Sequence, residues 1–140
     1  MTLLAIVGLS CGLTTAKINT EAKRLGLPIV ISSVEDLRTH SGFLPVKLAQ
    51  GDSGVETYYI DDPQALASLP PNASVLHSKS AILQFRWGTN FQEGATAFYI
   101  GYVLSKTCNA VLFEAESGNY IPAEAALQGA EAMVSMGNSK

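Results

Sequence analysis

The stretch from Ser80 to Ser117 restricts the fold more than any other part of the chain, because it spells a strand, a helix and a second strand with few polar side chains. Residues 80–85 and 109–114 are short apolar runs typical of buried strands. Between them, residues 92–107 carry apolar side chains on every side of a helical wheel, which predicts a helix covered on more than one face. This segment is expected to form the core, and it predicts no active site.

Length and charge exclude several classes of protein. The 140 residues match one ordinary domain, so we expect a single domain over residues 1–140. With 47% hydrophobic and 15% charged residues, the composition is that of a folded protein. A formal net charge of −3 offers no basic field for a phosphate backbone, so we expect no nucleic-acid partner. No segment approaches the roughly twenty apolar residues of a membrane span, so we expect no membrane partner either.

The beginning of the chain superficially resembles an export signal. However, no Lys or Arg precedes Lys17, and the apolar run of about seven residues is short for such a signal. A first buried strand over Leu3 to Leu9 is the better interpretation. Cys11 and Cys108 show no CxxC spacing, so the sequence predicts neither a metal site nor a redox pair. These features favour a reduced, cytoplasmic protein.

The remaining elements are predicted from apolar periodicity and from helix-capping residues. They are a helix over 17–25 capped by Thr14 or Thr15 and ended by Gly26, a strand over 28–34, two hairpin strands over 42–48 and 55–60 joined by a turn over 49–54, a short helix over 63–68 capped by Asp61 or Asp62, and a final helix over 123–136. This order predicts an α/β or α+β fold with a single mixed sheet of about five to six strands and three main helices packed on it.

The most distinctive local string is Phe85 to Glu93, where a strand turns into a helix. Such turns are where α/β proteins place ligands. However, Asn90 followed by Glu93 also spells a capping box, and we favour that structural interpretation. Arg86 and Trp87 belong to residue types enriched at binding hot spots. A pairing of Arg86 with Glu114 on a neighbouring strand is equally consistent with the sequence.

The sequence contains no recognisable motif for catalysis or metal binding. His40 and His77 are the only histidines, and they form no HxH, HxxxH or HExxH spacing. No GxSxG elbow and no phosphate-binding glycine motif occurs. We therefore expect no catalytic residues, no metal and no cofactor, and a protein that is not an enzyme.

Several strings along the chain carry a resemblance. They are Ser-Gly-Phe-Leu-Pro-Val at 41–46, Ser-Gly-Val-Glu-Thr-Tyr-Tyr at 53–59, Phe-Arg-Trp-Gly at 85–88, the Ala-rich helix that follows, and Leu-Phe-Glu-Ala-Glu-Ser-Gly at 112–118. From Ser41 to Met136 the chain resembles small uncharacterised bacterial proteins associated with immunity partners of secreted antibacterial toxins, of the type VI or contact-dependent kind. This resemblance implies a cytoplasmic protein that binds and neutralises a cognate toxin or effector domain without a cofactor. It supplies no catalytic residue.

If the chain binds such a partner, we expect the hairpin from Asp52 to Asp62 to make the contact. Tyrosines are anchors of low conformational entropy, and carboxylates complement a basic cleft. The predicted partner-binding residues are Glu56, Tyr58, Tyr59, Asp61 and Asp62 of this hairpin, together with Arg86 and Trp87. The opposing interpretation is that a tyrosine packs in the core and the carboxylates cap the following helix.

Two other functions remain open from the sequence. One is a small-molecule-binding or enzymatic domain in which Arg86, His77, Glu93 and Glu114 meet at the ends of adjacent strands. The other is an oligomeric structural module, such as a homodimer, which requires an exposed apolar face.

Overall fold

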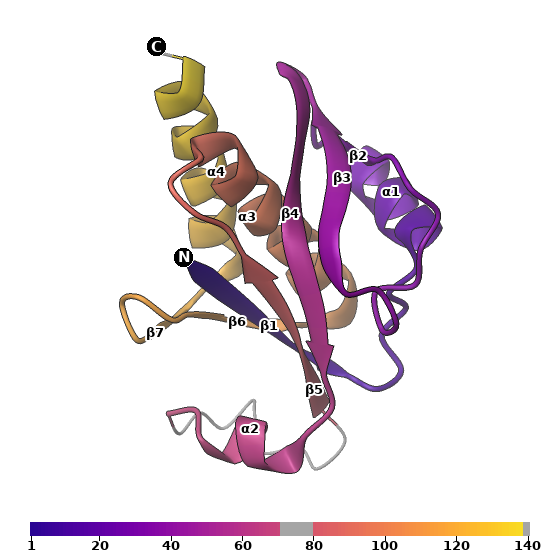
Figure 1. Ribbon diagram of the computed structural model, residues 1–140, viewed down its shortest axis with the longest axis vertical. Coiled ribbons are helices and arrows are strands. Elements are labelled where there is room, and N and C mark those ends of the chain that lie inside the picture. Colours follow the sequence, from indigo (N-terminus) through magenta and orange to yellow (C-terminus); the bar gives the residue numbers. More distant parts are fainter. Residues whose placement is uncertain (71–79, 139–140) are drawn as a thin grey trace.

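A seven-stranded sheet forms the centre of the computed structural model, which describes residues 1–70 and 80–138 (Figure 1). The strand order is β2-β3-β4-β5-β1-β6-β7, and every neighbouring pair is antiparallel. The strands are β1 (Thr2–Gly8), β2 (Ile29–Ile31), β3 (Gly42–Leu48), β4 (Gly51–Ile60), β5 (Ser80–Arg86), β6 (Val111–Glu114) and β7 (Asn119–Ile121). The helices are α1 (Thr15–Arg24), α2 (Pro63–Ala67), α3 (Phe91–Cys108) and α4 (Ala123–Asn138).

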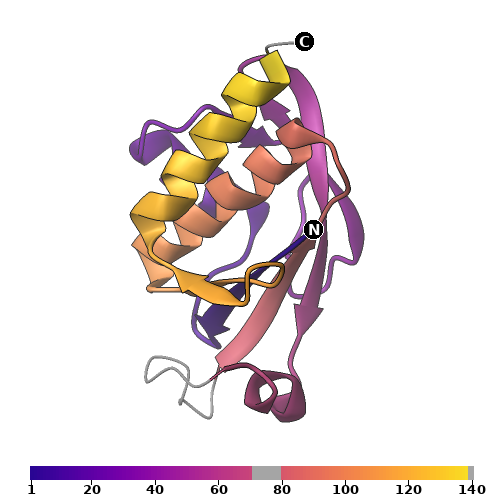
Figure 2. The same ribbon diagram turned by 90° about the vertical axis from the view of Figure 1, so that its left-hand side faces the viewer.

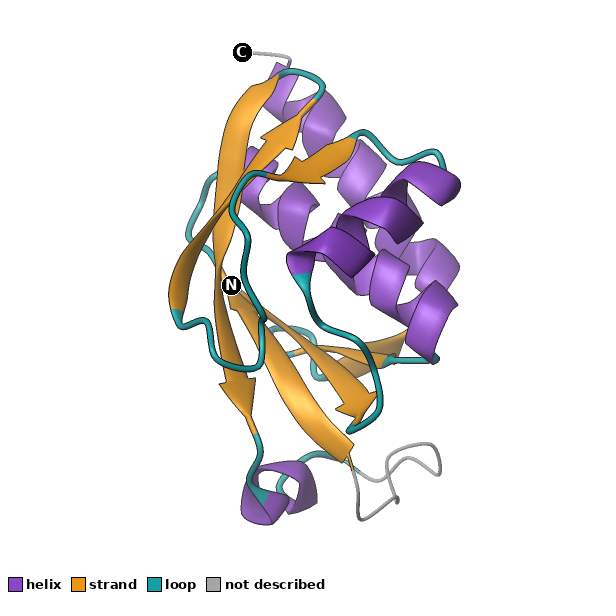
Figure 3. Ribbon diagram, turned by 90° about the vertical axis from the view of Figure 1, so that its right-hand side faces the viewer, coloured by secondary structure: helices purple, strands orange, loops and turns teal. Residues whose placement is uncertain are grey.

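The helices α1, α3 and α4 lie on one side of the sheet (Figure 3), where α1 and α3 contact the strands and α4 packs on α3. Alternate residues of the strands point into this layer, including Leu3 and Ala5 of β1 and Leu83 and Phe85 of β5, and all four are fully buried. Helix α3 lies against β1 and β4 and is covered on its other side by α4 (Figure 2), which explains why its apolar residues surround the helical wheel.

The close packing of α3 and α4 depends on a small residue. A Cβ placed on Gly94 would lie 2.6 Å from the sulfur of Met133 and 2.8 Å from Nε1 of Trp87. Gly94 therefore allows α4 and the Trp87 indole to approach the first turn of α3.

The opposite face of the sheet is only partly covered. Ile6, Ile82 and Phe113 form a second apolar cluster there, packed against Leu66 and other residues of the α2 region. This cluster lies at the end of the sheet where α2 is seen at the bottom of Figure 1. Over β2, β3 and the first half of β4, the same face has no covering helix among the described residues.

Cys11 and Cys108 are joined by a disulfide, with Cα atoms 5.6 Å apart. Cys11 lies in the loop after β1, and Cys108 is the last residue of α3. The prediction that the cysteines form no redox pair is therefore wrong. The two residues are separated by 97 positions, and only the packing of α3 against β1 brings them together.

The sheet also differs from the sequence-based prediction. It is antiparallel instead of mixed, it has seven strands, and the described residues contain four helices. The short strand β7 was not predicted. The turn expected over 49–54 contains only Ala49 and Gln50 between paired residues, because Leu48 already pairs with Gly51. None of the described helices combines the length and apolar character needed to cross a membrane.

Candidate functional site

The uncovered part of the sheet is the surface most suited to contact another molecule, and we call it the open face. It is formed by alternate residues of β2 to β5, namely Val30, Phe43, Pro45, Lys47, Asp52, Glu56, Tyr58, Gln84 and Arg86. Val30 is 56% exposed and Phe43 is 53% exposed. Large apolar side chains that are exposed together on one sheet face are typical of interaction surfaces.

Three of the predicted partner-binding residues meet on the open face. Glu56 lies opposite Phe43 on β3 and opposite Arg86 on β5. The hydroxyl of Tyr58 donates a hydrogen bond to Oε1 of Glu56. This hydrogen bond raises the pKa of the Tyr58 phenol, because it stabilises the protonated form beside a negative charge. Glu56, Tyr58 and Arg86 thus form one polar group beside an exposed aromatic ring.

Charges on the open face alternate in sign across the strands. Lys47 on β3 lies opposite Asp52 on β4, and Glu56 on β4 lies opposite Arg86 on β5. Opposite charges at directly paired positions support the sheet. They also give this face a defined pattern of potential, which orients a partner more than it adds to affinity.

Two predicted partner-binding residues lie on the other side of the sheet. Tyr59 is paired with the fully buried Leu83, so its side chain is directed toward the helix layer, and burial raises the pKa of its phenol. Trp87 is only 9% exposed, and its ring meets Phe98 of α3 edge-on, with centroids 5.9 Å apart. Trp87 is a core residue, and it is not available as the surface anchor that its residue type suggested.

Asp61 and Asp62 follow the end of β4, at the opposite end of this strand from the hairpin turn. Both are exposed, and Oδ1 of Asp62 accepts a hydrogen bond from the amide of Gln64 at 3.0 Å. Asp62 is therefore the N-cap of α2, as the opposing interpretation of the sequence stated. These two carboxylates do not join the group around Glu56.

The residues proposed for a small-molecule site are not gathered by the fold. Arg86 and Glu114 are on β5 and β6, which are separated by β1, so the alternative in which Arg86 pairs with Glu114 on a neighbouring strand is wrong. Glu114 pairs with Leu3 and shares its side of the sheet, whereas Arg86 belongs to the open face. Glu93 lies in the first turn of α3. His77 lies outside the described residues.

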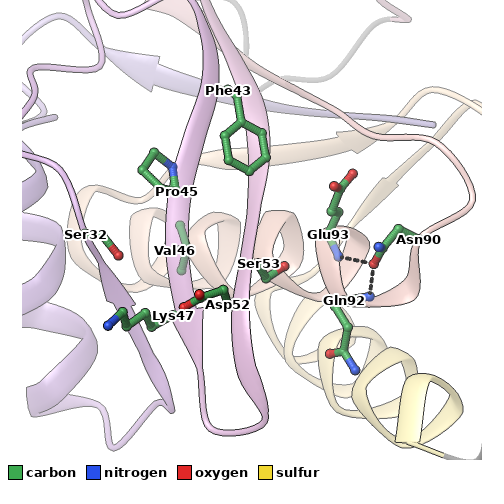
Figure 4. Close-up of a pocket in the computed structure, with 10 residues that line it drawn as sticks. All are labelled: Ser32, Phe43, Pro45, Val46, Lys47, Asp52, Ser53, Asn90, Gln92 and Glu93. Atoms are coloured by element: carbon green, nitrogen blue, oxygen red, sulfur yellow. Dashed lines mark hydrogen bonds between the residues drawn. The ribbon is translucent and has the colours of Figure 1, made fainter.

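A pocket of about 520 Å³, which we call the notch, overlaps one end of the open face and shares Phe43, Pro45, Lys47 and Asp52 with it (Figure 4). It is lined by Ser32, Phe43, Pro45, Val46, Lys47, Asp52, Ser53, Asn90, Gln92 and Glu93. The notch exists because β5 leaves the sheet at Arg86, opposite Glu56, while β4 continues as far as Gly51. The sequence does not predict the notch, because the expected turn over 49–54 places no strand edge at residues 51–54.

The α3 wall of the notch is built by helix capping and a hydroxyl network. Oδ1 of Asn90 accepts hydrogen bonds from the amides of Gln92 at 2.9 Å and Glu93 at 3.1 Å, which confirms the predicted N-cap. The hydroxyl of Thr96 donates to the carbonyl of Gln92 at 2.9 Å, so Ser53 is the donor in its 3.1 Å bond to Thr96. This network holds β4 against the first turns of α3.

The described residues contain no group of three or more His, Cys, Asp or Glu side chains placed to hold a metal ion. Neither a family model, nor a curated protein, nor a solved structure was found to match this chain.

Proposed function

We propose that this protein is an immunity-type binding protein that neutralises a cognate bacterial toxin or effector domain through its open face. The observation that carries the proposal is the exposure of Val30 and Phe43 on a sheet face beside Glu56, Tyr58 and Arg86. The resemblance of residues 41–136 to immunity-associated proteins supports the same function.

The composition of the open face suits a protein partner. Aromatic residues and Arg supply most of the binding energy at protein interfaces, and Phe43, Tyr58 and Arg86 lie close together on adjacent strands. Because these side chains project from paired strands, little backbone ordering is needed on binding. A stable complex buries about 800 Å² on each partner, roughly a ninth of the 7114 Å² surface of this structure.

The disulfide indicates the kind of compartment in which the protein would bind its partner. Disulfides persist in oxidising compartments and are rare in the reducing cytoplasm. The Cys11–Cys108 bond therefore supports a site of action in an oxidising compartment, in place of the cytoplasmic location expected from the sequence.

A direct test uses toxin or effector domains encoded beside this gene. Binding is measured by calorimetry, and neutralisation is measured as rescue of growth on co-expression. We expect Phe43→Ala and Arg86→Glu each to weaken binding by at least about tenfold, as hot-spot substitutions do. Lys23→Glu is the matched control for charge reversal, because Lys23 is exposed on α1 away from the sheet.

Two outcomes would contradict the proposal. One is that no neighbouring gene product binds or is neutralised. The other is that a neutralised domain binds both open-face variants as tightly as the unmodified protein.

The alternative function is a small-molecule-binding or enzymatic domain. The notch supports it by size, since ligand pockets span about 300–1,000 Å³. Of Arg86, Glu93 and Glu114, only Glu93 lines this pocket, so the acid–base set expected from the sequence does not assemble there. For this reason we favour the binding protein.

A further inference from the structure

Strand β4 has a free edge along half its length. It pairs with β3 from Gly51 to Thr57, but with β5 only from Glu56 to Ile60. On the β5 side, residues 51–55 have no strand neighbour in the described part of the chain. Along such an edge, alternate residues present backbone N–H and C=O groups that no strand partner satisfies.

The space beside this edge is open. After Arg86 the chain leaves the sheet and enters α3 at Phe91. The position beside residues 51–55 of β4, where a longer β5 would pair, therefore holds no strand of the described chain. The side chains of Asn90 and Glu93 lie across the notch from β4 in Figure 4. The 520 Å³ pocket includes this space and continues over β3 as far as Ser32, and of the edge residues 51–55 it is lined by Asp52 and Ser53. The bond between Ser53 and Thr96 fixes the depth of this space, because it holds α3 directly behind the edge.

The walls of the notch combine apolar and charged side chains, which suits the alternating side chains of an extended peptide. On the open-face side, the Phe43 ring lies over Gly54, where an added Cβ would be 2.3 Å from Cζ of the ring. Phe43 and Pro45 thus provide apolar contact. Two carboxylates, from Asp52 and Glu93, outnumber the single cation of Lys47 among the lining residues.

The usual protection of a sheet edge is weak at this place. Natural proteins block edges with Pro, with charged side chains, most often Lys, or with a covering element, and the one charged residue among 51–55 is Asp52. Residues 51–55 read Gly-Asp-Ser-Gly-Val and contain neither Pro nor Lys. Pro45 and Lys47 lie on β3, one strand further in.

We infer that the notch binds an extended peptide segment of a partner protein, which adds to the sheet as a strand beside residues 51–55 of β4 and directs a basic side chain toward Asp52 and Glu93. Main-chain hydrogen bonds supply the affinity in this mode, and the side-chain pockets supply the selectivity. The inference goes beyond the proposed function, since it requires neither a toxin nor the group around Glu56 and Arg86.

The test is a titration of the ¹⁵N-labelled protein, followed by amide chemical shifts, with the capped peptide acetyl-Thr-Val-Lys-Val-Thr-amide. We expect saturable shifts at residues 51–55 and at Gln92 and Glu93, with a dissociation constant on the order of 1 mM. The same peptide with N-methyl groups on its two valines has lost main-chain donors, and we expect its affinity to fall at least several-fold. Glu93→Gln should weaken binding several-fold at low salt. Glu124→Gln, which removes the matching first-turn acid of α4, should leave binding unchanged.

Four results would overturn the inference. The first is that the peptide causes no saturable shift at several millimolar. The second and third are that the N-methylated peptide, or n-butylamine as a bare cation, binds as tightly as the unmodified peptide. The fourth is that the shifts at residues 51–55 depend on protein dilution alone. The last result would assign the edge to a second copy of this chain. None of them bears on binding through the open face when that binding is read from Arg86→Glu, because Arg86 does not line the notch, whereas Phe43 lines both surfaces.

Discussion

Replacing Cys11 and Cys108 together by alanine should lower the free energy of unfolding by about 4–5 kcal/mol. The disulfide links residues separated by 97 positions, and cross-linking a loop of about 100 residues removes roughly that much chain entropy, expressed as free energy at 25 °C, from the unfolded state. The folded state loses little in comparison, because alanine keeps the Cβ atom of each cysteine. The effect is large against a typical total stability of about 5–15 kcal/mol.

The same loss predicts a shift of the melting temperature. Unfolding entropy is about 2.1 cal mol⁻¹ K⁻¹ per residue, so about 0.3 kcal mol⁻¹ K⁻¹ for the 140 residues, and the midpoint should fall by about 15 °C. Thermal and urea unfolding are followed by circular dichroism for the oxidised protein, the reduced protein and the double variant. The reduced protein and the double variant should behave alike, since both lack the cross-link.

Two observations would refute this reasoning. One is alkylation of both thiols in the native, unreduced protein, which would mean that the bond does not form. The other is an oxidised protein whose midpoint lies within about 2 °C of that of the double variant, a difference worth less than about 1 kcal/mol for a chain of this size.

Three further predictions concern single interactions. Asn90→Ala should lower the free energy of unfolding by about 1 kcal/mol in urea denaturation, because the amides of Gln92 and Glu93 lose their acceptor. Asn90→Asp should retain the cap, and equal stability of the unmodified protein and both variants would contradict this prediction. Glu56→Gln should lower the pKa of Tyr58 toward its ordinary value, which NMR titration of the ring measures, and an unchanged pKa would mean that the hydrogen bond is not formed in solution. The hydrogen bonds from Arg38 hold the pKa of Asp36 below its ordinary value, so their stabilisation is present at neutral pH and is lost as the pH falls through the lowered pKa. Arg38→Ala should therefore reduce the dependence of unfolding free energy on pH as the pH falls below 3.8, the ordinary pKa of an Asp carboxyl, and an unaltered dependence would argue against this pair.

The helices were predictable because their signals are local. The helix ends are each encoded within a few residues. The structure confirms the cap at Asn90 and the Gly after α1, and it selects Thr14 from the expected Thr14 or Thr15 and Asp62 from the expected Asp61 or Asp62. Strand pairing is not local. The sequence shows that residues 80–85 and 109–114 are strands, but nothing near them shows that β1 lies between them.

The candidate site was predictable only in part, for a related reason. Alternation along β4 identifies Glu56 and Tyr58 as neighbours on one face, but the face that the helices cover is decided by packing, and this places Tyr59 and Trp87 inward. Residues 51–54 are rich in turn-forming types, yet their pairing with β3 extends the strand through them. The notch was hidden because both the strand extension and the departure of β5 are tertiary features.

The central place of β1 has a consequence for how the chain is made. Leu3 pairs with Phe85 and with Glu114, so both neighbours of the first strand are synthesised roughly 80 and 110 residues after it. Translation adds about 5–20 residues per second, so β1 stays without its strand partners for roughly 5–20 s after it is synthesised. Limited proteolysis of nascent chains stalled at increasing lengths should find β1 protected only in chains long enough for Glu114 to have left the ribosome. Over the same interval the nascent protein exposes an unpaired hydrophobic segment that chaperones recognise.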